Sequence, residues 1–201
     1  AVPIGEQSGL LDIKNNIKNI DFGEINSFQI EKNNELDLYF EHIQNLVSPA
    51  KINDKIKFGV DGGNGAIGSI FDELAKIYNF NCDELYMDVD GNFPNHPADP
   101  SNKENLQEII KLVEDNNLDF GVAFDGDADR AVFIDDVGKV VSGSMMTALI
   151  ADYLSETNDN LKVVYNVNVS PHALSILESK EILLFRCKVG HSNIKAMMKE
   201  L

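Results

Sequence analysis

Apolar residues recur along this chain in two periods, and the two periods alternate. Spacings of three and four residues predict helices, and short continuous or alternating apolar runs predict strands. The predicted helices cover residues 10–20, 36–47, 67–78, 106–113, 144–154, 171–178 and a last segment from 192. The predicted strands cover residues 56–60, 83–89, 120–124, 131–134, 139–141, 162–167 and 182–187.

The order of these elements predicts the fold class. Strands that alternate with helices of about 10–15 residues are typical of α/β folds with a largely parallel sheet. Residues 135–138 form a short polar turn between two apolar runs, which predicts one antiparallel hairpin. We therefore expect an α/β fold in which a mixed, largely parallel sheet is flanked by helices, followed by part of a second, similar domain.

Composition and charge limit the classes of molecule that this protein is expected to bind. The chain has 201 residues, of which 43% are hydrophobic, and its 17 basic and 33 acidic residues give a formal net charge of −16. This composition is typical of a globular protein. Because the net charge is strongly negative, nucleic acid and anionic membrane surfaces are unfavourable partners, and a phosphorylated substrate needs a cation beside it. The most apolar stretch, residues 145–151, is far shorter than the ~20 residues that span a bilayer, so we expect a cytoplasmic protein.

Three aspartates at alternate positions follow the predicted strand 120–124. They are Asp125, Asp127 and Asp129, and Arg130 comes next. Carboxylates this close repel one another unless a cation lies among them, and Mg²⁺ prefers such oxygen ligands. The guanidinium of Arg130 suits a phosphate beside the metal. An EF-hand is excluded because Arg130 stands where its loop needs glycine and strands flank the segment. A solvated acidic turn remains the alternative.

A glycine-rich turn follows the strand 56–60. Residues 63–68 spell G-x-G-x-x-G before a predicted helix, and Asp88 lies twenty residues beyond Gly68. This spacing is typical of a dinucleotide-binding turn. A tight strand-to-helix turn that needs glycine for its backbone conformation fits equally well, so the motif alone leaves both interpretations open.

Two further stretches contain residues that could bind a ligand or take part in catalysis. The four histidines are not spaced as a zinc set, and we interpret His96, in the loop 91–100, as a hydrogen-bonding residue. Near the end of the chain, Gly190 precedes a predicted helix whose free amides suit an anion. Capping of that helix by Ser192 is the alternative.

Taken together, these stretches resemble the α-D-phosphohexomutase family, in particular its phosphomannomutase/phosphoglucomutase branch. Residues 125–130, DGDADR, resemble the family's DGDGDR with Ala128 as the one departure. The other matching stretches are GNFPNH at 91–96 with Asp99-Pro100 and Glu104-Asn105-Leu106, DGGNG at 61–65, and GHSNIK at 190–195. The resemblance implies that residues 1–47 end domain 1, residues 48–140 form domain 2 with the metal loop, and residues 141–201 begin domain 3.

The resemblance also implies an activity. Such isomerases interconvert the 1-phosphate and 6-phosphate of mannose or glucose through a phosphoserine and a bisphosphorylated sugar, such as glucose 1,6-bisphosphate. By resemblance, Asp125, Asp127 and Asp129 hold Mg²⁺ together with a phosphoserine oxygen. Arg130 is then a catalytic and substrate-binding residue beside the metal, and His191 binds the sugar. The implied partners are a phosphosugar and the remaining domains of the parent enzyme.

Some family features are missing from this sequence. It contains neither a TASHNP-like serine segment nor a GEMSGH-like sugar loop, and Asn168 stands where some relatives carry lysine. We therefore expect a fragment that supplies the metal loop without the serine and is inactive alone. The alternatives are a non-catalytic module that binds a metal or a sugar phosphate, and a dinucleotide-binding oxidoreductase domain.

Overall fold

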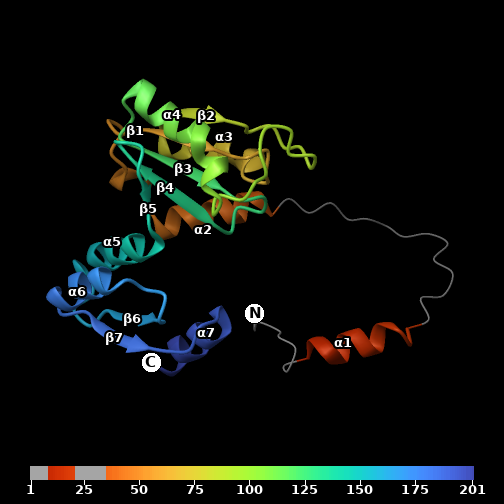
Figure 1. Ribbon diagram of the computed structural model, residues 1–201, viewed down its shortest axis with the longest axis vertical. Coiled ribbons are helices and arrows are strands. Elements are labelled where there is room, and N and C mark those ends of the chain that lie inside the picture. The colour runs from red at the N-terminus through yellow and green to blue at the C-terminus, as the bar shows by residue number, and fades with distance from the viewer. Residues whose placement is uncertain (1–8, 21–34) are drawn as a thin grey trace.

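The computed structural model describes residues 9–20 and 35–201 (Figure 1). Its first elements are the helices α1 (Leu10–Ile17) and α2 (Leu36–Leu46) and the short 3₁₀ helix η2 (Pro49–Lys51). The stretch around Gly23, whose sequence predicts a turn, lies outside the described residues. Two α/β units follow η2 along the chain (Figure 1).

A five-stranded sheet forms the centre of the first unit. Its strands are β1 (Lys57–Asp61), β2 (Asn81–Leu85), β3 (Phe120–Phe124), β4 (Ala131–Asp135) and β5 (Val140–Val141), in the order β2-β1-β3-β4-β5. Strand β1 pairs in parallel with β2 and β3, whereas β3-β4 and β4-β5 are antiparallel pairs. The predicted mixed α/β sheet, including its hairpin, is confirmed.

Helices cover both faces of this sheet. They are α3 (Gly68–Tyr78) and α4 (Gln107–Asn116), the latter preceded by the 3₁₀ helix η3 (Lys103–Leu106). Adjacent residues of a strand point to opposite faces. Val122 of β3 belongs to the core cluster with Phe71 of α3, and Ala123 belongs to the cluster with Ile109 of α4. The two helices therefore pack on opposite faces of the sheet.

Helix α4 lies unusually close to the two central parallel strands. Gly59 and Gly121 are paired neighbours in β1 and β3. A Cβ atom at Gly59 would lie 2.8 Å from Cδ1 of Ile109, and one at Gly121 would lie 2.8 Å from Cγ2 of Val113. Because neither strand residue has a side chain, the apolar side chains of α4 fill that space. This packing fixes α4 across β1 and β3.

The second strand differs from its prediction. The sequence pattern predicts a strand over 83–89, but β2 ends at Leu85. The next residue, Tyr86, has φ 55°, a left-handed conformation that cannot continue an extended strand. Asp88 therefore lies in the irregular segment between β2 and η3 and not at the end of a strand.

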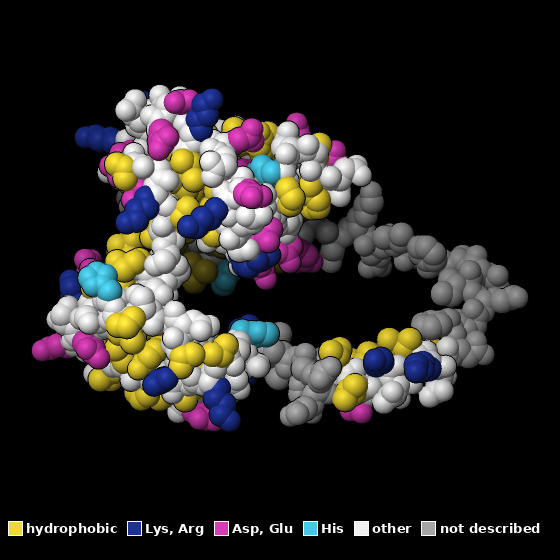
Figure 2. Space-filling view, in the orientation of Figure 1, with side chains coloured by type: hydrophobic (Ala, Val, Ile, Leu, Met, Phe, Trp, Pro, Cys, Tyr) yellow, Lys and Arg dark blue, Asp and Glu magenta, His cyan; other side chains and the backbone are white. Residues whose placement is uncertain are grey.

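The second unit is smaller. It contains α5 (Gly143–Ser155), β6 (Lys162–Tyr165), α6 (Pro171–Ser179), β7 (Leu183–Arg186) and α7 (His191–Glu200). Strands β6 and β7 pair in parallel. Its core consists of Ala148, Ala151, Ala173, Leu177 and Ile182. Apolar side chains remain on its surface (Figure 2), among them Leu149, Ile150 and Tyr153 of α5.

No helix within the described residues is long and apolar enough to span a bilayer.

The packing of α4 can be tested with a matched pair of substitutions. Val113 is 0% exposed against the sheet, and Val137, in the β4-β5 turn, is 69% exposed. We expect Val113→Ala to lower the free energy of unfolding by about 1–3 kcal/mol, because it removes buried methyl groups and leaves a cavity. Val137→Ala should change it by less than about 0.5 kcal/mol. Urea unfolding of both variants measures the difference, and equal effects would contradict the packing described.

Candidate metal centre

The acidic loop, residues 125–130, begins directly after β3. One ligand atom from each of Asp125, Asp127 and Asp129 lies within 4.8 Å of the other two. Asp125 is 2% exposed, whereas the other two aspartates are exposed. Within residues 9–20 and 35–201 this is the one group of three or more acidic, histidine or cysteine side chains close enough to hold a metal ion.

The loop closes around the side chain of Asp125. The backbone N–H of Arg130 donates to Asp125 Oδ1 at 3.0 Å, and the N–H of Ala128 donates to the Asp125 carbonyl at 3.1 Å. The N–H of Asp125 donates in turn to the Arg130 carbonyl at 3.2 Å. Ala128 has φ 58°, a left-handed conformation that turns the chain back toward β4. These bonds hold Asp125 in one position.

Arg130 compensates part of the negative charge of the loop. Its Nε lies 2.6 Å from Asp125 Oδ2 and 3.7 Å from Asp129 Oδ1, and its Nη1 lies 3.5 Å from Asp99 Oδ1. Burial acts to raise the pKa of the Asp125 carboxyl, but the backbone and side-chain hydrogen bonds and the charge of Arg130 outweigh it and hold that pKa below its usual value. Asp125 is therefore ionised at neutral pH.

The donor set fits a hard divalent cation. Three carboxylates and one guanidinium leave two negative charges in the loop, and all the candidate ligand atoms are oxygens. Magnesium takes oxygen ligands and is bound through a few carboxylates, with water or phosphate oxygens in the other positions. The exposure of Asp127 and Asp129 gives a cation access from solvent.

The glycine-rich turn supports the acidic loop. A Cβ atom at Gly65 would lie 2.9 Å from the carbonyl oxygen of Gly126, and one at Gly68 would lie 1.8 Å from the carbonyl oxygen of Met87. The N–H of Ala66 also donates to the Gly126 carbonyl at 2.9 Å. Neighbouring loops of the chain itself fill the space beside these glycines. The interpretation as a tight structural turn is therefore favoured over the dinucleotide-binding one.

A second support comes from the 91–99 loop. A Cβ atom at Gly126 would lie 3.6 Å from Cζ of Phe93 and 3.9 Å from Cβ of Ala98, so both side chains lie beside the acidic loop. The carboxylate of Asp99 also reaches Arg130. Asp99 was named only as part of a family-like stretch, and its contact with Arg130 was not predicted because it joins positions far apart in the sequence.

Further hydrogen bonds join the 91–99 loop to the glycine-rich turn and to the end of β1. The side chain of Asn64 accepts from that of Asn95 and donates to the Asp88 carbonyl, both at 2.8 Å. His96 contacts Asp61, the last residue of β1, at 3.0 Å. The prediction that His96 makes hydrogen bonds in its loop is confirmed. The roles of Asn64 and Asp61 were not predicted.

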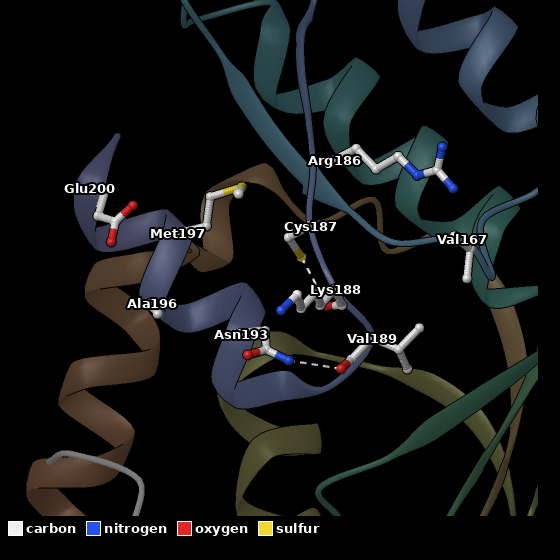
Figure 3. Close-up of a pocket in the computed structure, with 9 residues that line it drawn as sticks. All are labelled: Val167, Arg186, Cys187, Lys188, Val189, Asn193, Ala196, Met197 and Glu200. Carbon is white, nitrogen blue, oxygen red and sulfur yellow. Dashed lines mark hydrogen bonds between the residues drawn. The ribbon is translucent and has the colours of Figure 1, made fainter.

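A separate hollow lies in the second unit (Figure 3). It has a volume of about 890 Å³ and is lined by the segment after β7 and by one side of α7. Lys188 and Arg186 line it, and Figure 3 shows the Arg186 side chain extending away from α7. The side chain of Asn193 donates to the Val189 carbonyl at 2.9 Å. Glu200 lines it as well, and the hollow does not include the acidic loop.

His191 is the first residue of α7 and is exposed. Within the described part of the chain, no hydrogen bond or ion pair joins it to Arg130 or to the acidic loop. Gly190 occupies the N-cap position, and no side chain caps the helix. Capping by Ser192 is therefore wrong.

Comparison with known proteins gives the family. The family model for phosphoglucomutase/phosphomannomutase α/β/α domain II matches residues 37–138, and the model for domain III matches residues 142–201. The chain belongs to the phosphoglucomutase/phosphomannomutase family. The predicted domain boundaries at 48 and 141 remain predictions.

Relatives and solved structures agree with this family. The chain is 34% identical over 172 residues to a phosphomannomutase/phosphoglucomutase of Pseudomonas putida. The matched region covers 86% of the chain and 36% of the relative. It is 32% identical to a phosphoglucomutase of Neisseria meningitidis, over 83% of the chain and 36% of the relative. A family member from Burkholderia thailandensis superposes with a TM-score of 0.81 at 30% identity, over 98% of the chain and 42% of that structure. The chain thus spans about a third of the length of these curated relatives.

The backbone at Ala128 yields a test of the loop geometry. Alanine is strained at φ 58°, where glycine is not, and the family motif that this loop resembles has glycine there. We expect Ala128→Gly to raise the free energy of unfolding by about 0.5–1 kcal/mol. Ala131→Gly, in the regular strand β4, should lower it by about 0.5–1 kcal/mol. Thermal unfolding of the two variants shows whether each one is more or less stable than the wild type. A destabilised Ala128→Gly variant would contradict the loop conformation.

Proposed function

We propose that this chain supplies the Mg²⁺-binding loop of a cytoplasmic phosphohexomutase, which interconverts hexose 1-phosphate and hexose 6-phosphate of mannose or glucose. The reaction runs through a phosphoserine from another part of the parent enzyme and a bisphosphorylated sugar such as glucose 1,6-bisphosphate. One observation carries the proposal. In a chain of this family, three carboxylates with ligand atoms within 4.8 Å of one another follow a central strand of the sheet.

The acidic loop supplies the ligands. Asp125 is fixed by Arg130 before any cation arrives, so the loop presents a preorganised oxygen. Asp127 and Asp129 add exposed carboxylates. Bound Mg²⁺ would neutralise charge that develops on the oxygens of the transferring phosphoryl group. The protein itself carries a charge of −16, so a phosphorylated substrate approaches it favourably only where such positive charge is concentrated.

Arg130 is proposed to bind phosphate beside the cation. Its side chain is 59% exposed, and its contacts with Asp125 and Asp99 use two of its three guanidinium nitrogens. A guanidinium has five N–H donors, so donors remain for a phosphate oxygen. Arg130 would thus position the phosphoryl group and offset its charge.

The second unit is proposed to contribute to sugar binding through His191. His191 begins α7, one side of which lines the hollow with Lys188, and the N-terminus of a helix favours an anionic ligand. We further propose that residues 1–47, 48–140 and 141–201 belong to three successive domains of the parent enzyme.

Metal titration tests the central residues. We expect Mn²⁺ or Mg²⁺ to bind the wild-type chain, and Asp127→Asn to weaken binding about tenfold or more, because it removes one of three ligand charges. The matched control is Asp136→Asn, which removes the same charge from the exposed β4-β5 turn of the same unit. Isothermal titration measures both. The ligand assignment fails if Asp127→Asn and Asp136→Asn bind the metal with equal affinity.

A further inference from the structure

His96 lies between two oxygen atoms. Its Nε2 is 3.0 Å from Asp61 Oδ2, and its Nδ1 is 3.0 Å from the carbonyl oxygen of Pro97. Asp61 is 1% exposed, and its other carboxylate oxygen accepts a hydrogen bond of 2.8 Å from the Gly63 N–H. The partly buried ring of His96 therefore contacts the buried carboxylate of Asp61, the last residue of β1.

This geometry fixes one proton between the two side chains. A neutral imidazole has one N–H, so with both ring nitrogens facing oxygens either the ring carries two protons or Asp61 carries one. We assign the proton to His96, because imidazole is more basic than a carboxyl group and the Gly63 N–H stabilises the carboxylate.

The surrounding charges act in the same direction. Burial lowers the pKa of His96, but the Pro97 carbonyl, Asp61 on β1 and Glu108 on α4 outweigh it and raise that pKa above its ordinary value. Tyr86 packs its ring edge-on against His96 and hydrogen bonds to Glu108. Burial raises the pKa of the Asp61 carboxyl and so acts against this assignment, whereas the Gly63 N–H and the charge of His96 act to lower that pKa.

The residues that directly follow His96 reach the acidic loop. A Cβ atom at Gly63 would lie 3.2 Å from Cβ of Ala98, and one at Gly126 would lie 3.9 Å from that same atom. Ala98 therefore lies between the glycine-rich turn and the acidic loop. The next residue, Asp99, contacts Arg130 at 3.5 Å. Two residues beyond His96, the 91–99 loop is thus already in contact with the acidic loop.

We propose that the His96–Asp61 pair is a positioning element that holds the 91–99 loop against the acidic loop and so keeps Asp125 and Arg130 in place. The inference rests on the proposed function, because the ligand of the positioned residues is the cation proposed there. His96 does not touch the acidic loop itself, so its effect passes through Ala98 and Asp99.

Asp61→Asn is the conservative variant. An asparagine at this position can still accept from the Gly63 N–H, and its amide can donate to Nε2 of a neutral His96 ring while Nδ1–H donates to Pro97. This variant keeps the shape of the contact and removes its charge. His96→Ala removes the contact altogether. His172→Ala, on the exposed side of α6, is the matched control.

The test uses the full chain without metal. Hydrogen exchange is followed at the amides of Ala128 and Arg130, whose N–H groups donate within the acidic loop. We expect His96→Ala to speed their exchange about tenfold, while Asp61→Asn and His172→Ala stay within about twofold of wild type. Ring ¹⁵N signals should show His96 doubly protonated near pH 7 in the wild type and neutral in Asp61→Asn.

The pH dependence separates positioning from a merely structural role. The pKa of His96 is raised on folding, so its contribution is fully present below the unfolded value of about 6.5 and is lost as the pH rises through the folded value. Protection of the acidic-loop amides should fall over that range in the wild type. It should stay constant in Asp61→Asn, where the neutral ring already fits.

Three results would overturn the inference. They are a neutral wild-type ring near pH 7, unchanged loop exchange in His96→Ala, and identical pH profiles for wild type and Asp61→Asn. If His96→Ala does not fold, the ring signals and the two pH profiles decide the question without it. Because no metal is present, a failure here is distinct from a failure of the proposed function, which the Mn²⁺ titration reports separately.

Discussion

The parallel pairing of β1 and β3 determines where the residues of the candidate metal centre lie. In this register Asp61 is opposite Ala123, so the two strands end side by side and the segments that follow them emerge at the same edge of the sheet. The glycine-rich turn follows β1, and the acidic loop follows β3. Helix α4 packs closely over Gly59 and Gly121 and fixes the two strands relative to each other. Without this pairing the two loops would not meet.

Charge and backbone shape at that edge depend on one another. Carboxylates so close together repel, and Arg130 offsets part of this repulsion by binding Asp125 through both its backbone and its side chain. Neighbouring segments then approach the loop: a Cβ atom at Gly65 would collide with the Gly126 carbonyl, and Phe93 and Ala98 lie at van der Waals distance from a Cβ atom at Gly126. The acidic cluster is thus held by contacts with two other loops, the glycine-rich turn and the 91–99 loop.

Much of this fold can be predicted from the sequence, because the spacing of apolar residues indicates which face of each helix or strand is buried. The strand over 120–124 and the antiparallel hairpin were predicted from local pattern alone. The end of β2 was not, because Tyr86 has a left-handed conformation and contacts His96 and Glu108, which lie in other segments of the chain. The aspartates of the acidic loop were found because they are adjacent in sequence. The Asp61–His96 and Asp99–Arg130 contacts were missed, because each joins residues about thirty positions apart.

The central claim is that the acidic loop binds a divalent cation through its three aspartates. Anomalous diffraction from crystals of the chain soaked in Mn²⁺ tests it most directly, because it locates the ion without reference to activity. The account predicts one strong peak with carboxylate oxygens of Asp125, Asp127 and Asp129 around it, at the ~2.0–2.2 Å typical of small divalent ions. A strong peak elsewhere with none at this loop would contradict the account.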